Sequence, residues 1–395
     1  MPMIGNIDIV FLGTASAQPS PTRNHSSLAL RFDGRIWLFD AGEGTQHQII
    51  KSDLKAGKVE KIFVTHLHGD HCFGIPGLLC TLSQAAGGWS PGEDKDMKFE
   101  IFGPKGTREY IRNALKSTHS RLGCRYTVHE LHFPNELSTP ANETMHDDEI
   151  AGRDIELTFG SNATHPAESH WSVFHDPETD ITVTAGPIAH TIPCIGYVIQ
   201  EPPHSGNINI STLQPHLERN RKMLAEQGVK NPSILIGRLM SQQSLTLPDG
   251  TNLLLRDHLT RPTPGRKITI LGDTNDPSQI THLALDSDLL IHEATNACLK
   301  ADLASGQTPS SVQESTISHG HSTPEMAGAF ARMVGARKLV LNHFSSRYKG
   351  DLSEESLRIM DEIRALAVGT FMKEVVICAR DFLNVEIVRR LADAG

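Results

Sequence analysis

The chain has 395 residues, enough for one large hydrophobic core or two medium domains. Hydrophobic residues make up 38% of it, charged residues 21%, and the mean hydropathy is -0.26. No apolar run approaches the roughly 20 residues of a membrane-spanning helix, so we expect a soluble protein without a membrane partner. The six cysteines form no Cys-x-x-Cys pair, which argues against a disulfide-stapled secreted scaffold and favours a reducing compartment, the cytoplasm or the nucleus.

The formal net charge is -9, which by itself argues against a polyanionic partner such as nucleic acid. The charge is unevenly distributed, however. Residues 135–180 contain eleven acidic residues and one basic residue, so the rest of the chain is close to neutral. Because this tract is also rich in turn-forming residues, we interpret 135–180 as an acidic surface insertion, with disorder as an equal possibility.

The predicted elements alternate between short apolar strands and amphipathic helices. The first strand lies within residues 1–13, a segment that lacks the basic and small-residue features of a cleaved export signal. In chain order there follow a strand at 61–66, a helix at 75–86, a strand at 99–103, a helix at 107–117, strands at 181–190 and 267–273, a helix after Pro277, a strand at 289–295, a helix from Pro324 and a strand at 338–343. This alternation predicts an α/β fold.

Residues 201–266 interrupt the alternation. They contain a helical stretch at 213–227, and we predict a hairpin at 245–255 around Asp249-Gly250. Eight Lys or Arg residues stand against five Asp or Glu residues in this tract. The tract therefore reads as an inserted region with a positive charge.

The strongest functional signal is the run Thr65-His-Leu-His-Gly-Asp-His71, which follows a strand. Residues two apart in an extended chain point the same way, so His66 and His68 can reach one metal ion. Gly69 then allows the chain to turn, which places Asp70 and His71 near a second ion. Four ligand-type side chains within six residues predict a metal site.

Three more ligand-type residues each end an apolar strand, namely His190, Asp273 and His343. Strand ends converge at one rim of an α/β sheet. The five histidines and two aspartates could hold two ions, with the Asp273 carboxylate as the natural bridge. Nitrogen-rich donors with carboxylate favour zinc, with manganese or iron as substitutes. Two such ions, about 3.5–4 Å apart, are typical of a hydrolase that activates water for an in-line displacement.

The run His66–His71 resembles the signature of the metallo-β-lactamase superfamily. This resemblance implies a four-layer αββα sandwich that forms a single catalytic domain over 1–395. Further motifs resemble those of short-form tRNase Z, the ribonuclease Z or zinc phosphodiesterase ELAC family. They are Phe11–Ser16, Pro19–Asn24, Leu38–Gln46, His292–Thr295, Gly320–Thr323 and Asn342–Tyr348.

Enzymes of this family remove the 3′ trailer from precursor tRNA and leave a 3′-hydroxyl on the tRNA. The resemblance implies two zinc ions per chain, one held by His66, His68, His190 and Asp273, the other by Asp70, His71, Asp273 and His343. It also implies that Asp70 accepts the proton of the attacking water. The leaving ribose O3′ needs a proton, and we predict that Glu293 and His321 form a carboxylate–imidazole pair that supplies it.

Asp40 is interpreted as a carboxylate that orients a ligand imidazole, with a capping role before Gly42 as the alternative. Arg23, Asn24, Arg347 and Tyr348 are predicted to bind phosphates or stack an unpaired 3′ nucleotide, with surface solvation as the alternative for each. The resemblance also implies that 201–266 is the tRNA-binding arm, or exosite, of a homodimer. Its tip at Val229–Ser233 departs from the Gly-Pro tip of the family.

Three alternatives stay open. Another phosphodiesterase of the same fold would act on other RNA ends, such as 2′,3′-cyclic phosphates, and only dependence on a folded acceptor stem separates the two. A non-cutting RNA-binding relative would bind RNA without metal. A thiolester or β-lactam hydrolase is disfavoured because Glu293 and His321 suit oxyanion protonation in phosphorus chemistry better than acyl transfer.

Overall fold

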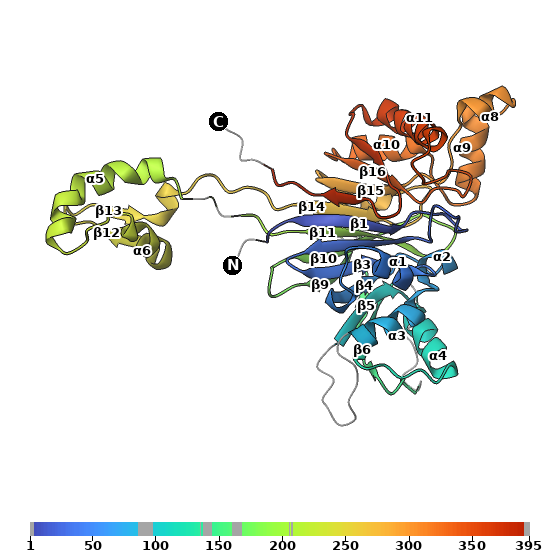
Figure 1. The fold of residues 1–395 in the computed structure, drawn as a ribbon, viewed down its shortest axis with the longest axis horizontal. Coiled ribbons are helices and arrows are strands. Elements are labelled where there is room, and N and C mark those ends of the chain that lie inside the picture. The colour runs from blue at the N-terminus through green and yellow to red at the C-terminus, as the bar shows by residue number, and fades with distance from the viewer. Residues whose placement is uncertain are drawn as a thin grey trace. The chain divides into compact units, whose positions relative to one another are not determined.

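The structure is a computed structural model that describes residues 4–85, 98–134, 136, 144–159, 168–204, 206 and 208–390. The chain divides into two compact units, Met1–Glu201 with Arg266–Val388, and Pro202–Gly265 with Arg389–Gly395 (Figure 1). Each unit has a hydrophobic core of its own. None of the helices in the described ranges combines the length and the apolarity that crossing a bilayer requires.

The larger unit contains a nine-stranded sheet and a seven-stranded sheet. The first runs in the order β18 (Asn384–Glu386), β1 (Ile7–Gly13), β2 (Ser27–Phe32), β3 (Arg35–Phe39), β4 (Val59–Phe63), β5 (Lys98–Pro104), β6 (Arg125–His132) and β7 (Glu149–Ile150), and β8 (Asp154–Glu156) also pairs with β6. Strands β3 to β6 are parallel. Parallel neighbours need crossover connections, and these carry the helices α1 (Thr45–Lys51), α2 (Gly69–Cys72), α3 (Ile75–Ala85) and α4 (Thr107–Ser117).

The second sheet runs in the order β17 (Val376–Cys378), β16 (Leu339–Asn342), β15 (Leu289–Glu293), β14 (Lys267–Leu271), β11 (Cys194–Gln200), β10 (Thr182–Ile188) and β9 (Trp171–His175). Strands β14 to β17 are parallel, and β10 points the same way as β14 because each is antiparallel to β11. The carboxyl ends of β10, β14, β15 and β16 therefore meet at one rim. The connecting helices are α7 (Thr281–Ala284), α8 (Lys300–Ala304), α9 (Pro309–Ser318), α10 (Pro324–Met333) and α11 (Glu354–Phe371).

Successive side chains of a strand point to opposite faces of its sheet. One face of each sheet packs against the other sheet and the other face packs against helices, which gives four layers. In β1, Ile9 and Phe11 pack between the two sheets, whereas Val10 and Leu12 face the core beneath α1, α3 and α4. In β15, Ile291 points between the sheets and Leu290 faces α10 and α11. Helices thus cover the outer face of each sheet (Figure 1). This arrangement confirms the predicted four-layer αββα architecture.

The acidic tract 135–180 is not simply a surface insertion. Trp171 and Val173, on β9, are 0% and 1% exposed and belong to the core between the sheets. Glu149 is buried as well, and its Oε1 lies 2.7 Å from an Arg112 nitrogen. The many carboxylates obscured the alternating pattern of β9 in the sequence. Residues 135, 137–143 and 160–167 of this tract lie outside the described residues.

The smaller unit consists of α5 (Ile210–Glu226), α6 (Ile234–Gln242) and a hairpin of β12 (Ser244–Thr246) and β13 (Asn252–Leu254). The hairpin confirms the prediction made for 245–255, and Gly250 takes the left-handed φ of 84° that its turn requires. The core is made of leucines from α5, α6, β13 and the connecting segments: Leu213, Leu217, Leu224, Leu235, Leu239, Leu247, Leu253 and Leu255. The main segment of this unit, Pro202–Gly265, coincides with the 201–266 tract to within one residue at each end. Its tRNA-binding role stays a prediction.

A candidate metal centre at the sheet rim

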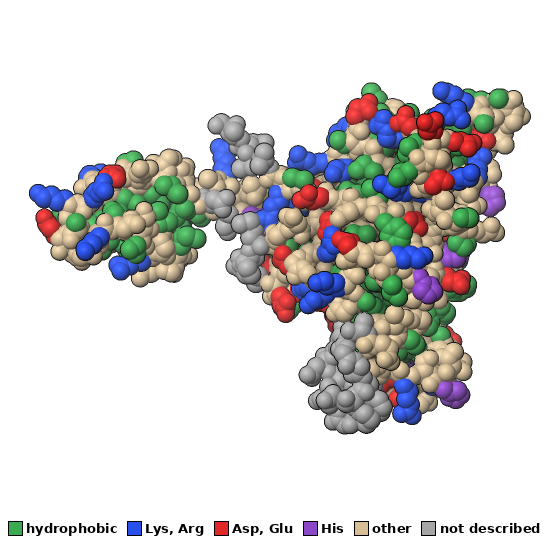
Figure 2. Space-filling view, viewed as in Figure 1, with side chains coloured by type: hydrophobic (Ala, Val, Ile, Leu, Met, Phe, Trp, Pro, Cys, Tyr) green, Lys and Arg blue, Asp and Glu red, His purple; other side chains and the backbone are tan. Residues whose placement is uncertain are grey.

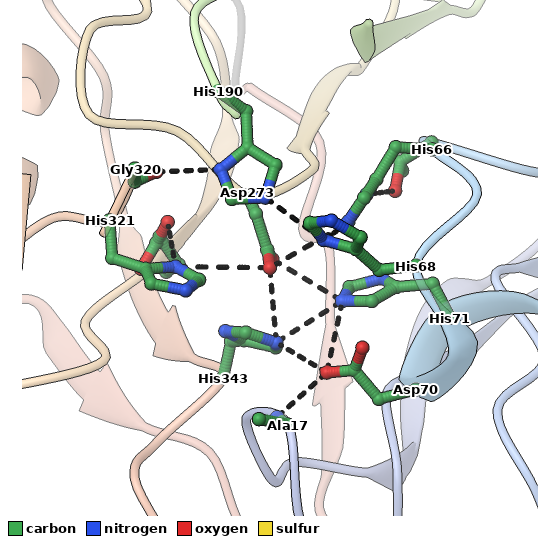
Figure 3. Close-up of polar contacts among 12 residues, drawn as sticks. Ala17, His66, His68, Asp70, His71, His190, Asp273, Gly320, His321 and His343 are labelled. Atoms are coloured by element: carbon green, nitrogen blue, oxygen red, sulfur yellow. Dashed lines mark hydrogen bonds and ion pairs between the residues drawn. The ribbon is translucent and has the colours of Figure 1, made fainter. Parts of the chain in front are cut away.

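The predicted ligands all lie where strands end or where α2 begins. His66 and His68 follow β4, His190 follows β10 and His343 follows β16. Figure 3 shows these side chains pointing toward the carboxylate of Asp273, which follows β14. The fold therefore brings together residues from distant parts of the chain.

The first group contains His66, His68, His190 and Asp273, whose ligand-type atoms all lie within 4.8 Å of one another. The Nδ1 atom of His68 is 3.2 Å from His66 Nε2 and 3.1 Å from His190 Nε2. The Oδ2 atom of Asp273 is 3.7 Å from His66 Nε2. Three imidazole nitrogens and one carboxylate oxygen thus surround a common point, as the ligands of a tetrahedral zinc ion do.

The second group contains Asp70, His71 and His343. His71 Nε2 is 3.1 Å from His343 Nε2, and the Oδ2 of Asp70 is 3.4 Å from His343 Nε2. Asp273 reaches this group too, because its Oδ1 is 3.4 Å from His71 Nε2 and its Oδ2 is 3.3 Å from His343 Nε2. The Asp273 carboxylate therefore stands between the two groups, in the position of a bridging ligand.

Hydrogen bonds on the far side of two rings decide which nitrogen faces the site. His190 Nδ1 donates to the carbonyl oxygen of Gly320 at 2.7 Å, and His71 Nδ1 donates to Asp40 Oδ2 at 2.7 Å. Because Nδ1 carries a proton, Nε2 is the atom of each ring that faces the centre, and it offers a lone pair there when the ring is neutral. Asp40 occupies the position predicted for an orienting carboxylate. The donor set fits zinc.

The electrostatics keep the donors in forms that suit metal binding. Burial lowers the pKa of His66, His68 and His190, so these imidazoles are neutral at physiological pH. Burial alone would raise the pKa of Asp273, but its electrostatic interactions with His343 and His71 outweigh burial and lower that pKa. These three neutral imidazoles and the ionised carboxylate are in the forms that a divalent cation requires. Burial lowers the pKa of His71, but the charges of Asp273 and Asp40 outweigh burial and raise it, so His71 would release a proton when a cation binds.

Backbone strain occurs at three positions around the site. Ala17, Asp40 and His343 each have a φ of 57°, in the left-handed region that costs a non-glycine residue about 1 kcal/mol or more. The turn at Ala17 aims its backbone N–H at Asp70 Oδ2, 2.7 Å away. Burial alone would raise the pKa of Asp70, but its hydrogen bond with His343 and the charge of His71 lower it. Asp70 is therefore a fixed, ionised carboxylate.

Glu293 and His321 form the predicted pair beside the metal groups. The His321 Nδ1 atom lies 3.1 Å from Glu293 Oε1, and its distance to Asp273 Oδ2 is 3.8 Å. Burial lowers the pKa of His321, but the hydrogen bond to Glu293 and its charge outweigh burial and raise that pKa to about 9. No described residue hydrogen-bonds to His321 Nε2. At neutral pH His321 is thus an imidazolium with a free N–H at the site.

Two of the residues predicted to bind substrate are buried instead. Arg23 is 1% exposed, and its guanidinium donates to the hydroxyl of Thr14 at 2.7 Å and to the carbonyls of Ala379 at 2.9 Å and Tyr348 at 2.8 Å. Tyr348 is 2% exposed, and its hydroxyl accepts a hydrogen bond from Ala297 N. Neither side chain can reach RNA, so the prediction was wrong for both. Their hydrogen bonds instead connect loops that lie beneath the rim.

The other two predicted contacts are also held by the protein. The side chain of Asn24 donates to the Glu43 carbonyl at 3.0 Å. Arg347 forms a bidentate pair with Asp302, both nitrogen–oxygen distances being 3.0 Å, yet its side chain is 40% exposed. A role of Asn24 or Arg347 in binding RNA stays a prediction.

The structure adds groups that sequence reasoning missed. The Ala17 amide and the Gly320 carbonyl are backbone atoms, which no residue pattern identifies. The hydroxyls of Thr65 and Thr295 contact ring nitrogens of His66 and His343. Both threonines lie inside recognised motifs, but a sequence contains no distances from which their partners could be found.

One protein-family model and several known proteins are similar to this chain. Residues 7–117 match a family model described as Anti-Pycsar protein Apyc1. Over 390 residues the chain is 37% identical to the zinc phosphodiesterase ELAC protein 1 of Bos taurus, covering 97% of this chain and 99% of that protein. It is 33% identical to the ribonuclease Z of Streptococcus sanguinis, covering 96% of this chain and 100% of that protein.

Two solved structures are similar. Human tRNase Z, short form, is 32% identical, has a TM-score of 0.59, and the match covers 96% of this chain and 99% of that one. The metallo-β-lactamase fold protein YhfI of Bacillus subtilis is only 15% identical, with a TM-score of 0.52 and coverage of 97% and 100%. The second match bears on the fold alone, and the two together confirm the predicted metallo-β-lactamase sandwich.

Proposed function

The chain belongs to the family of ribonuclease Z and zinc phosphodiesterase ELAC protein 1, and we propose that it is a zinc-dependent endoribonuclease that cleaves the 3′ trailer from precursor tRNA. The family resemblance expected from the motifs is thus confirmed. The observation that carries the proposal is the convergence of seven ligand-type side chains in two groups with Asp273 between them. Retention of all seven argues against a non-cutting RNA-binding relative.

Two zinc ions per chain are proposed, and manganese or iron could use the same donors. Asp273 would contact both ions. When bound, the ions would polarise the scissile phosphate and lower the pKa of a water molecule. The proposed ligands of the first ion are His66, His68, His190 and Asp273, and those of the second are Asp70, His71, Asp273 and His343.

The chain's own residues carry the proton transfers. Asp70 accepts the proton of the attacking water, and the amide of Ala17 holds its Oδ2 atom in place. The water oxygen forms the new bond to phosphorus while the bond from phosphorus to the ribose O3′ breaks. His321 gives its Nε2 proton to that O3′, and Glu293 stabilises the imidazolium beforehand. The products are a tRNA 3′-hydroxyl and a trailer with a 5′-phosphate.

The smaller unit is proposed as the tRNA-binding arm. Lys222, Lys230, Arg238 and Arg261 are exposed there, and none of them forms an ion pair with an acidic residue in the described part of the chain. Figure 2 shows blue side chains at several places on the visible face of this unit. Replacing all four by glutamine should weaken precursor tRNA binding and flatten its salt dependence, with metal content unchanged. An unchanged salt slope would remove the arm from the proposal.

We also propose a homodimer that works in the cytoplasm, the nucleus or both. In that dimer the arm of one subunit presents RNA to the partner's centre. Sedimentation equilibrium of the purified chain tests the assembly, and a monomer with full activity on precursor tRNA would contradict it.

The direct test of the proposed reaction uses purified full-length protein and a precursor tRNA labelled at its 5′ end. Cleavage should occur at the start of the trailer, leave a 3′-hydroxyl, stop with a chelator and resume when zinc is restored. A precursor with a disrupted acceptor stem is the control. Equal cutting of both RNAs, or action restricted to 2′,3′-cyclic phosphate ends, would favour the alternative phosphodiesterase. RNA binding without any cleavage would favour the non-cutting relative.

A further inference from the structure

Two threonine hydroxyls, that of the buried Thr65 and that of the half-buried Thr295, each stand between a carboxylate and a histidine of the candidate metal centre. Thr65 Oγ1 lies 2.9 Å from Asp40 Oδ2 and 3.0 Å from His66 Nδ1. Thr295 Oγ1 lies 2.5 Å from Glu293 Oε2 and 3.1 Å from His343 Nδ1. The same three-membered arrangement therefore occurs twice, once in each half of the sandwich.

The direction of the hydrogen bonds follows from counting protons. A hydroxyl has one proton to donate and two lone pairs, whereas an ionised carboxylate only accepts. Each threonine therefore donates to its carboxylate and has only a lone pair left for the imidazole. For Thr295 the carboxylate oxygen at 2.5 Å is both closer and more strongly accepting than the His343 carbonyl oxygen at 3.0 Å. The ring must then supply the proton of the second bond, so Nδ1 of His66 and of His343 carries hydrogen. In the neutral ring Nε2 is consequently the bare nitrogen.

These Nε2 atoms face the two groups of proposed metal ligands. His66 Nε2 lies 3.2 Å from His68 Nδ1, and His343 Nε2 lies 3.1 Å from His71 Nε2. His71 and His190 obtain the same tautomer from direct contacts with Asp40 and the Gly320 carbonyl. For His66 and His343, the threonine hydroxyl takes the place of that direct acceptor.

We propose that Thr65 and Thr295 are positioning residues that set the tautomers of His66 and His343, so that both rings present Nε2 to the metal centre. The inference rests on the proposed zinc site. Thr65 orients His66, a proposed ligand of the first ion, and Thr295 orients His343, a proposed ligand of the second. Loss of an orienting partner of this kind typically weakens metal affinity about 10- to 100-fold.

The two arrangements differ in what remains after the hydroxyl is removed. Asp40 keeps its bonds with His71 and with the backbone N–H of Thr65, so Thr65→Val disturbs His66 alone. Thr295→Val removes the donor to Glu293 Oε2, although Oε1 keeps its bond from Thr274 N. Each variant should therefore lower the affinity for one zinc ion about 10- to 100-fold, while the affinity for the other ion stays close to that of wild type.

The experiment uses the full-length chain with Thr65→Val, Thr295→Val, and the serine variants at both positions. Zinc affinity is measured by competition with a chromophoric chelator, and histidine tautomers are read by ¹⁵N NMR of metal-free protein. Each valine variant should weaken the binding of one zinc ion, and the neighbouring histidine should no longer be held with its proton on Nδ1. Each serine variant should restore both the zinc affinity and the tautomer. Thr269→Val is the control, because that buried hydroxyl pairs with Ser287 and hydrogen-bonds to none of the described histidines.

Wild-type affinity for both ions together with unchanged tautomers in the valine variants would overturn the inference. Equal weakening by Thr269→Val would do the same, because it would assign the effect to general loss of stability. The NMR readout needs no metal and no RNA. Failure of wild-type protein to bind two zinc ions or to cut precursor tRNA would therefore contradict the proposed function separately.

Discussion

His71 and His343 meet through their Nε2 atoms at 3.1 Å although they are 272 positions apart in the chain. His71 belongs to α2, next to the first sheet, and His343 follows β16 of the second. The contact joins the two halves of the sandwich at the rim where Asp273 also ends its strand. Two imidazoles with bare nitrogens repel each other at this distance unless a proton or a metal ion lies between them. The candidate site therefore depends on correct packing of both sheets.

Replacing His321 by glutamine should reduce kcat for precursor tRNA cleavage about 10²- to 10⁴-fold, because the leaving O3′ loses its proton donor. The dissociation constant for RNA should stay near its wild-type value. Single-turnover cleavage and RNA binding measured on the same preparation provide the comparison. His319→Gln is the matched control, since that histidine is exposed and bonds to the Ser315 carbonyl. Equal losses of binding and turnover would contradict the assignment.

The Glu293–His321 pair also predicts a pH dependence. In metal-free protein the pKa of His321 is about 9, raised from 6.5 because Glu293 outweighs burial. A raised folded-state pKa means that the pair's contribution to stability is complete below pH 6.5 and is lost as pH rises through about 9. NMR titration of the imidazole should give that value, and Glu293→Gln should lower it. A midpoint near 6.5 in the unaltered protein would refute the pairing.

Gly320→Ala should damage the first zinc site specifically. Gly320 has a φ of 82°, and an added Cβ would lie 2.7 Å from His190 Nδ1, the atom that its own carbonyl holds. Gly306→Ala is a matched control, because Gly306 has a φ of 89° and nothing within 4 Å of an added Cβ.

Both alanines incur backbone strain of about 1–2 kcal/mol, so both should lower the melting temperature by a similar amount. Only Gly320→Ala should weaken zinc binding in chelator competition. Equal zinc affinity in the two variants would mean that the Gly320 carbonyl does not orient His190.

Arg23→Ala distinguishes a structural arginine from one that contacts RNA. Removal of the guanidinium leaves the carbonyls of Ala379 and Tyr348 without a donor in a buried place. We expect a loss of about 2 kcal/mol or more in the free energy of unfolding, measured in urea. RNA affinity of the folded fraction should be unchanged. A large loss of RNA affinity with normal stability would restore the substrate-binding interpretation.

Much of the fold and the metal centre could be predicted because the local patterns are strong. His190, Asp273 and His343 each directly follow an apolar strand, and parallel strand ends converge by geometry alone. Other features depend on three-dimensional neighbours. Arg23 looks like a phosphate contact in its motif, and only the packing of distant loops makes it a buried donor. The strand at Trp171–His175 was hidden because surrounding carboxylates dominate the composition of its tract.

The most direct test of the metal centre is the zinc content of purified protein by mass spectrometry, compared between wild type and Asp273→Asn. Asp276→Asn is the control, an exposed carboxylate three positions further along. Wild type and the control should hold about two zinc ions per chain, and Asp273→Asn should lose affinity for both ions together, because its carboxylate stands between the two groups. Fewer than two ions in wild type, or a loss confined to one ion in Asp273→Asn, would contradict the bridged centre.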